Sequence, residues 1–111
     1  MDAIAELEEK ADYVAGRLAL LANPKRLLIL CFLTQGEASV GQIQRAVGMG
    51  QSALSQHLAR MRDAGIVATR RDAQTIYYRL EDPETAALLG ALYDTFCAHA
   101  YERTEPASTS G

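Results

Sequence analysis

The sequence predicts a mainly helical domain that carries one β-hairpin, with elements in the order α-α-α-α-β-β-α. Three observations support this fold class. Apolar residues recur at helical spacing towards both ends of the chain, two short helical segments meet at a glycine-containing turn, and two β-prone segments follow them directly. With 111 residues the chain is long enough for one domain with a small core, and a partner subunit would help to stabilise it.

The first two helices are predicted from apolar spacing and from a clear break between them. Apolar residues three or four positions apart predict an amphipathic helix that ends near Ala22. Asn23 suits an N-cap and Pro24 suits the first helical position, so a second helix is expected over about 24–34. Residues 27–33 are apolar almost all round, and this helix is therefore expected to form the core.

Two further short helices form a helix-turn-helix. Ser39 and Gln42 have the capping-box pattern, which predicts a helix over about 39–47. Residues 48–50, with two glycines, end that helix before another amphipathic segment at 51–62. Two short helices joined by a glycine-containing turn are typical of DNA-binding proteins.

The helix at 51–62 has one apolar stripe and one polar stripe. Ala53, Leu54, Leu58 and Met61 recur at helical spacing and are expected to face inward. The other stripe offers amides, hydroxyls and a guanidinium, which suit base edges and phosphates. We interpret it as a recognition helix, and the residues expected to contact DNA from it are Gln51, Ser52, Ser55, Gln56, His57 and Arg60.

Two positions of this helix have further interpretations. His57 is as well suited to packing as to bonding a phosphate. Gly50 offers no capping side chain, so Ser52 is expected to take over part of the N-cap role.

A basic hairpin follows the recognition helix. The β-prone segments 66–70 and 75–80 are joined across residues 71–74. A helix-turn-helix followed by such a hairpin is a winged helix, whose basic tip can reach phosphates or the minor groove. The alternative is an ordinary hairpin that only covers the core. We expect Arg70 and Arg71 to lie at the tip of the hairpin, and the wing residues expected to contact DNA are Arg70, Arg71 and Gln74.

The last helix is predicted over about 83–101, because Asp82-Pro83 repeats the cap-and-proline start. The first and last helices carry more apolar surface than one small domain covers, so they are expected to form a homodimer. We therefore expect a DNA-binding and dimerisation domain at 1–102 and a disordered polar tail at 103–111.

Charge distribution and missing motifs narrow the function. The net charge is −3, but residues 1–16 carry −4, residues 17–79 carry +6 and residues 80–111 carry −5. A basic centre between acidic ends fits a phosphate-facing middle. The sequence lacks a signal-peptide pattern, a membrane-length apolar run, a C-x-x-C motif and a phosphate-binding glycine loop. We expect a cytoplasmic protein with no membrane partner, no cofactor and no enzyme activity.

Three blocks, at 23–30, 52–58 and 75–80, resemble the ArsR-type winged-helix repressors over about residues 10–100. The resemblance implies a homodimer through the first and last helices that binds double-stranded operator DNA until an inducer alters the dimer. The family's usual metal sites are not matched. Its third-helix cysteine motif would fall at 39–46, which holds no Cys, and its last-helix site needs a second His beside His99.

The two cysteines suggest a different inducer. Cys31 in the second helix and Cys97 in the last helix can be neighbours if these helices pack side by side. One cysteine in each of these helices resembles the sulfide-responsive BigR/SqrR-like branch of the family. That resemblance implies a redox-sensing dithiol, in which a persulfide or polysulfide links the thiols by a disulfide or a longer sulfur bridge and lowers operator affinity.

Three alternatives stay open for these thiols. The same repressor can respond to peroxide through disulfide oxidation, it can bind a metal through Cys31, Cys97 and His99, or both thiols can be unreactive core residues. If the pair does sense sulfur, Cys97 is expected to react first, because Cys31 lies in an apolar helix.

Overall fold

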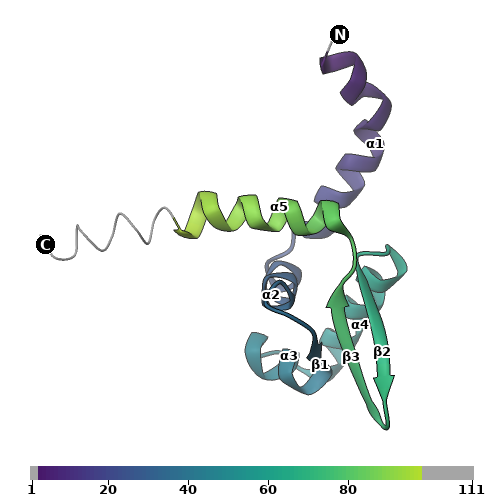
Figure 1. Cartoon of the computed structure of the whole chain (residues 1–111), viewed down its shortest axis with the longest axis vertical. Helices are drawn as coiled ribbons and strands as arrows, with labels where there is room; N and C mark the ends of the chain where they lie inside the picture. Colours follow the sequence, from purple (N-terminus) through teal and green to yellow (C-terminus); the bar gives the residue numbers. More distant parts are fainter. Residues whose placement is uncertain (1–2, 99–111) are drawn as a thin grey trace, which may run out of the picture.

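The computed structural model describes residues 3–98 and has the winged helix-turn-helix fold (Figure 1). The described part contains five α-helices, three strands and a terminal π-helical segment. In chain order these are α1 (Ala3–Leu21), α2 (Pro24–Leu33), β1 (Ala38–Ser39), α3 (Val40–Val47), α4 (Gln51–Asp63), β2 (Val67–Asp72), β3 (Thr75–Leu80), α5 (Pro83–Tyr93) and η1 (Asp94–Ala98).

Side-chain caps start three of the helices, as the sequence predicts. The Asn23 side chain accepts hydrogen bonds from the first amides of α2, and the Asp82 side chain does the same for α5. At α3, the Ser39 hydroxyl accepts from the Gln42 amide and the Gln42 side chain accepts from the Ser39 amide. Gly48 then ends α3 in the left-handed conformation, with φ of 65°, which a glycine adopts without strain.

The sheet differs from the prediction in two ways. The two-residue strand β1 was not predicted, because it is too short to show an alternating pattern; it pairs with β3, and the strand order is β1-β3-β2. The first hairpin strand also extends further than expected, to Asp72, which pairs with Thr75, whereas β3 has the predicted bounds. Arg70 and Arg71 therefore lie within β2, and the expectation that they form the tip is wrong.

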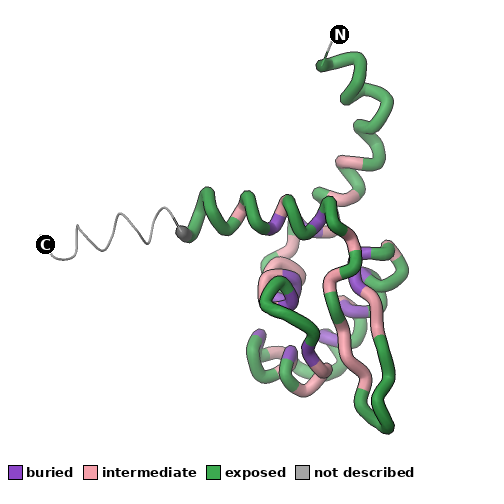
Figure 2. The backbone as a smooth tube through the Cα atoms, in the orientation of Figure 1, coloured by how far each residue is buried: buried purple, intermediate pink, exposed green. Residues whose placement is uncertain are grey.

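The core lies between α2, α3, α4 and the base of the wing (Figure 2). Two expectations are wrong. The apolar segment 27–33 is not buried on all sides, because Leu28 of α2 is 51% exposed, and Ala53 of α4, which was expected to face inward, is exposed. Successive residues of a helix are about 100° apart around its axis, so a residue that directly precedes a buried one can face solvent. The buried apolar residues are Leu21, Ile29, Leu30, Leu33, Ala38, Ile43, Val47, Leu54, Leu58, Met61, Ile66, Val67 and Leu89.

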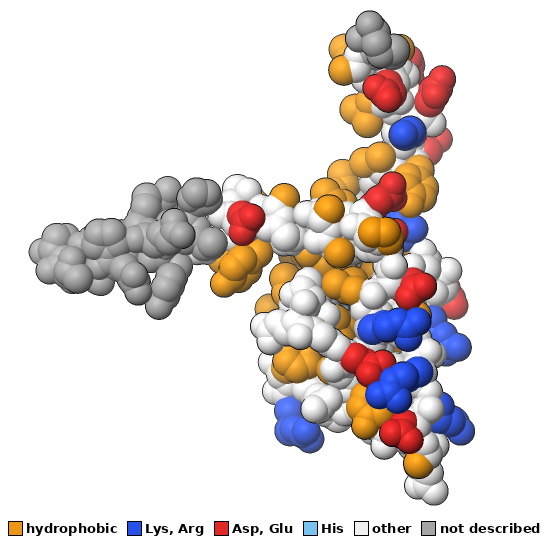
Figure 3. Space-filling view, viewed as in Figure 1, with side chains coloured by type: hydrophobic (Ala, Val, Ile, Leu, Met, Phe, Trp, Pro, Cys, Tyr) orange, Lys and Arg blue, Asp and Glu red, His pale blue; other side chains and the backbone are white. Residues whose placement is uncertain are grey.

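Helices α1 and α5 extend from this body as two arms (Figure 1). Leu21 is the one buried residue among the 19 of α1, while Leu7 and Leu18 are exposed. On the other arm, Tyr93 at the end of α5 and Phe96 in η1 are exposed. Figure 3 shows apolar side chains along both arms on the face in view. No helix of the described residues is long and apolar enough to cross a membrane.

Replacing Ser39 by Ala is expected to lower the free energy of unfolding by about 1 kcal/mol, because it removes the side chain that caps α3. Urea unfolding followed by circular dichroism measures this change. The control is Ser52→Ala, the same substitution at an exposed position of α4, where no side-chain cap is present. An equal loss in both variants would contradict the capping role.

Candidate DNA interface and cysteine pair

The outer face of α4 presents the polar stripe that the sequence predicts. Leu54, Leu58 and Met61 hold the inner face in the core. The predicted DNA contacts Gln51, Ser52, Ser55, Gln56 and Arg60 are all exposed. The fold therefore leaves their amides, hydroxyls and guanidinium accessible to a duplex.

The start of α4 has no side-chain cap. Gly50 occupies the N-cap position, and no side chain bonds the first amides, so the expectation that Ser52 shares the capping role is wrong. Uncapped amides and the positive end of a helix dipole favour an anion. A DNA phosphate is the anion that this helix would meet.

His57 lies on the flank of α4 between two guanidiniums. Arg26 Nη1 is 3.4 Å from His57 Nδ1, and Arg26 Nε donates to the Leu20 carbonyl oxygen at 2.6 Å. Burial lowers the pKa of His57, and the charges of Arg26 and Arg60 lower it further. Nδ1 therefore accepts from Arg26, and the neutral ring carries its proton on Nε2.

A groove of about 540 Å³ lies beside this ring and is lined by Arg26, Gln56, Arg60 and Asp63 as well as His57. Packing and phosphate bonding, the two uses predicted for His57, are thus compatible. One edge of the ring contacts Arg26, while the residue also borders an open groove.

Arg70 is already paired within the chain. Its Nε donates to both carboxylate oxygens of Glu37, at 2.9 and 2.8 Å, and its guanidinium lies 4.6 Å from the centre of the Tyr77 ring. The hydrogen bond to Glu37 is the main cause that raises the pKa of Arg70. Arg71 and Gln74 are exposed on the wing. A phosphate that binds Arg70 must therefore compete with Glu37.

The two cysteines lie on different elements of the fold and differ in burial. Cys31 of α2 is half-buried, Cys97 in the π-helical segment η1 is exposed, and both thiols are free. Burial raises the pKa of Cys31, and a negative charge on Cys97 raises it further. Cys97 is therefore the more accessible of the two thiols.

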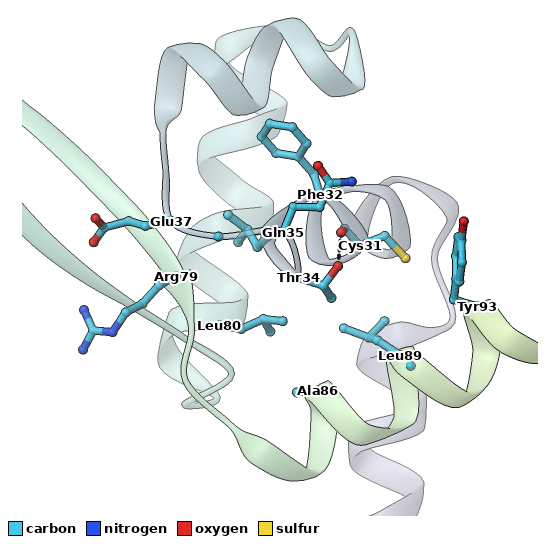
Figure 4. A pocket seen from close by; sticks show the side chains of 13 residues that line it. Cys31, Phe32, Thr34, Gln35, Glu37, Arg79, Leu80, Ala86, Leu89 and Tyr93 are labelled. Atoms are coloured by element: carbon cyan, nitrogen blue, oxygen red, sulfur yellow. Dashed lines mark hydrogen bonds between the residues drawn. The ribbon is translucent and has the colours of Figure 1, made fainter. Parts of the chain in front are cut away.

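A cavity of about 770 Å³ lies between α2, α5 and the loop that follows α2. Figure 4 shows the Cys31 sulfur pointing towards Tyr93 and Leu89 of α5. The remaining walls include Phe32 and Leu80. The Cys31 thiol thus borders a largely apolar space that small molecules can enter.

A metal site at this pair depends partly on His99, which lies outside the described residues. Within residues 3–98, no group of three or more His, Cys, Asp or Glu side chains is arranged to hold a metal ion.

Comparisons with known proteins identify the family. The model of the bacterial regulatory protein, arsR family, matches residues 23–69. The Biofilm growth-associated repressor of Xylella fastidiosa (strain 9a5c) is 45% identical over 93 residues, which are 84% of this chain and 82% of that protein. The chain belongs to the ArsR family.

Solved structures agree with this assignment. The transcriptional repressor BigR from Xylella fastidiosa superimposes on the chain with a TM-score of 0.83 and 43% identity, over 86% of this chain and 98% of that one. The homodimeric winged helix-turn-helix domain Mb0332 from Mycobacterium bovis gives a TM-score of 0.68 and 31% identity, over 92% of each chain. This ArsR-family protein is a DNA-binding transcriptional repressor and not an enzyme.

Sequence reasoning missed Arg26 and Glu37, although both lie within the stretch that the ArsR-family model matches. A signal for Glu37 was present, because only three acidic residues occur in the basic stretch 17–79. An isolated acid among cations is a candidate for an ion pair. No comparable signal marks Arg26, since its partners come from α1 and α4.

Replacing Glu37 by Gln is expected to raise DNA affinity about threefold at low salt and to steepen the logarithmic salt dependence by up to about 0.9, because the change frees the Arg70 guanidinium for one phosphate. Fluorescence anisotropy across a salt series measures both. The matched control is Glu81→Gln, which removes the same charge from the ion pair between Glu81 and Arg79. An equal gain in the control would mean that net charge alone is responsible.

Protein stability is expected to fall as the pH drops below 6.5, the ordinary pKa of histidine, because the folded chain holds His57 at a lower pKa than the unfolded chain does. His57→Asn should remove this dependence while leaving an acceptor for Arg26. Denaturant unfolding between pH 5 and pH 7.5 is the measurement. The pKa of Asp82 is also lowered, but protonation of Asp82 affects stability only below its ordinary pKa of 3.8, which lies outside this pH range. An unchanged pH profile in the Asn variant would contradict the assignment.

Proposed function

We propose that this repressor is a homodimer that reactive sulfur releases from operator DNA by linking Cys31 to Cys97. The observation that carries the proposal is the pair of thiols itself. One thiol is half-buried, the other is exposed, and the charge of one influences the pKa of the other. The described part of the chain contains no other cysteine. Repressor action on DNA takes place in the cytosol, which keeps structural disulfides rare and favours a transient bridge.

The dimer is supported by the two arms. Exposed apolar side chains on α1, α5 and η1, among them Leu7, Leu18, Tyr93 and Phe96, form a surface that a second copy would cover. One solved relative is described as homodimeric. In this proposal residues 1–102 act as one DNA-binding and dimerisation domain.

The DNA contacts in this proposal divide by role. Exposed groups near the start of α4 read the bases, and cations on α4 and the wing bind phosphates. Base readers are Gln51, Ser52, Ser55 and Gln56; phosphate-side residues are His57, Arg60, Arg70, Arg71 and Gln74.

The sulfur chemistry begins at Cys97, because this thiol is exposed whereas burial raises the pKa of Cys31. The Cys97 thiolate attacks the outer sulfur of a persulfide RSSH, which forms Cys97–S–SH and releases RS⁻. The Cys31 thiolate then attacks the Cys97 Sγ, so that the Sγ–SH bond breaks, the Cys31–Cys97 disulfide forms and HS⁻ leaves. Two thiols are oxidised while the persulfide is reduced to a thiol and sulfide. A polysulfide that leaves extra sulfur on Cys97 gives a longer bridge.

The bridge would act on DNA through the arms. It connects α2, which packs in the core, to the segment after α5, which belongs to the proposed dimer surface. Half-sites on DNA lie about 34 Å apart, one helical turn, so a change of dimer geometry weakens simultaneous binding by both recognition helices.

Polysulfide is expected to lower the operator affinity of the wild-type dimer at least about tenfold, a coupling of about 1.4 kcal/mol, and to leave Cys31→Ser and Cys97→Ser unaffected. Anisotropy titration measures affinity, and the intact mass gives the number of sulfur atoms in the bridge. Ala5→Cys, with a thiol at an exposed position of α1 outside the DNA-contacting residues, serves as a control for nonspecific thiol reaction in the Cys31→Ser background.

A wild-type affinity that polysulfide does not change would reject this proposal, and so would a full response in Cys31→Ser. An equal response to hydrogen peroxide would favour the peroxide alternative. Stoichiometric zinc after anaerobic purification would favour the metal alternative.

A further inference from the structure

Arg17 of α1 contacts the ends of two other helices. Its Nη1 donates to the Ala64 carbonyl oxygen at 2.8 Å, and Ala64 is the C-cap residue of the recognition helix α4. Its Nε lies 3.7 Å from Oδ2 of Asp82, the N-cap residue of α5. The carbonyl oxygen at a helix C-terminus carries partial negative charge and the Asp82 carboxylate carries a full one, so the Arg17 cation is attracted to both.

Tyr13, one turn earlier on α1, extends this junction. Its hydroxyl accepts from Arg17 Nε at 3.2 Å and donates to Glu84 Oε1 at 2.8 Å, and the guanidinium lies 5.1 Å from the ring centre. The bond with Tyr13 is the main cause that raises the pKa of Arg17. A hydrogen bond from Thr85 lowers the pKa of Asp82. Both groups are therefore charged at neutral pH.

The ends of α4 and α5 are joined independently of Arg17. The Ile66 carbonyl oxygen accepts from the amides of Glu81, at 2.8 Å, and Asp82, at 3.4 Å. The Ile66 amide in turn donates to the Met61 carbonyl oxygen at 2.9 Å. The backbone thus forms one unit from the end of the recognition helix to the start of α5.

By contrast, α1 has few attachments to that unit. Leu21 at its end is buried, whereas residues 3–13 are all exposed (Figure 2). Leu21 anchors one point of the helix, and one point does not define a direction. Arg17 and Tyr13 provide the second point, one and two turns away, where α1 contacts the joined ends of α4 and α5.

We infer that Arg17 is a positioning residue that sets the direction of α1 relative to the recognition helix and thereby the spacing of the two recognition helices in the dimer. The inference rests on the homodimer of the proposed function, because α1 reaches the second copy through its exposed apolar side chains. A change of α1 direction would move the second recognition helix without altering the base-reading face of the first. Arg17 would therefore govern which half-site spacing the protein accepts.

The test uses the reduced full-length protein and a palindromic duplex that the wild type selects from random DNA. Wild-type affinity is expected to fall at least about tenfold when one base pair is inserted between the half-sites. Arg17→Gln is expected to bind the original duplex about tenfold more weakly, and the insertion should change its affinity less than about threefold. A duplex with a single half-site should bind both proteins equally.

Three variants complete the comparison. Lys10→Gln removes one positive charge from the exposed part of the same helix and should keep the wild-type spacing profile. Arg17→Lys retains a cation and should restore part of the spacing preference. Tyr13→Phe removes only the hydroxyl between Arg17 and Glu84 and should shift the profile in the same direction as Arg17→Gln; it replaces Arg17→Gln if that variant does not fold.

A folded, dimeric Arg17→Gln protein with the wild-type spacing profile would overturn this inference and leave the proposed sulfur response intact. If Arg17→Gln does not fold, a wild-type profile in Tyr13→Phe has the same meaning. A wild-type protein that sediments as a monomer on DNA and in solution would overturn the proposed homodimer and this inference together.

Discussion

The packing of α2 in the core is the interaction on which the rest of the structure depends. Ile29, Leu30 and Leu33 of this helix are almost completely buried, and they contact the helix-turn-helix, the wing and α5 through one cluster. The same helix carries Arg26 at its start and Cys31 on its side, and Glu37 follows it. Because one close-packed cluster joins these elements, loss of the α2 packing would loosen the helix-turn-helix, the wing and the start of α5 together.

Electrostatics follow from this arrangement. Several cations of the basic centre are paired inside the chain, Arg70 with Glu37 and Arg79 with Glu81. Exposed ion pairs of this kind contribute little to stability, about 0–1 kcal/mol each, so a polyanion can replace the carboxylate. The acidic side chains of α1 lie on the arm that extends from the body (Figure 3). This separation of charge orients the basic body towards DNA.

The helices could be predicted because their signals are local. Asn23, Ser39 and Asp82 are caps whose partners lie two or three residues away, and the structure has all three. The strand β1 and the pairing of Arg70 with Glu37 could not be predicted, since each joins segments more than thirty residues apart in the sequence. The same reason applies to the Arg17 junction, where α1, α4 and α5 meet.

The apolar stripes were predicted less well, because periodicity gives a direction but not the width of the buried face. Ala53 matches helical spacing, and Leu28 lies in a segment that is apolar almost all round, but both residues are exposed. For Cys31 and Cys97, the sequence indicated two helices that can be neighbours. The apolar neighbours of Cys31 also predicted that Cys97 is the more accessible thiol, and the structure has Cys31 half-buried and Cys97 exposed.

The attachment of α5 determines how the proposed bridge can act. The start of α5 is fixed by the Asp82 cap, by Arg17 and by the backbone bonds to Ile66. Its eleven residues span about 16 Å, and beyond them lies the exposed Cys97. A bridge that draws Cys97 towards Cys31 would turn α5 about its fixed start, so the far end moves most and the junction with α4 moves least. The helix-turn-helix of each chain would stay intact, and the surface offered to the second copy would change. The proposed switch therefore has to work through the geometry of the dimer and not through distortion of the recognition helix.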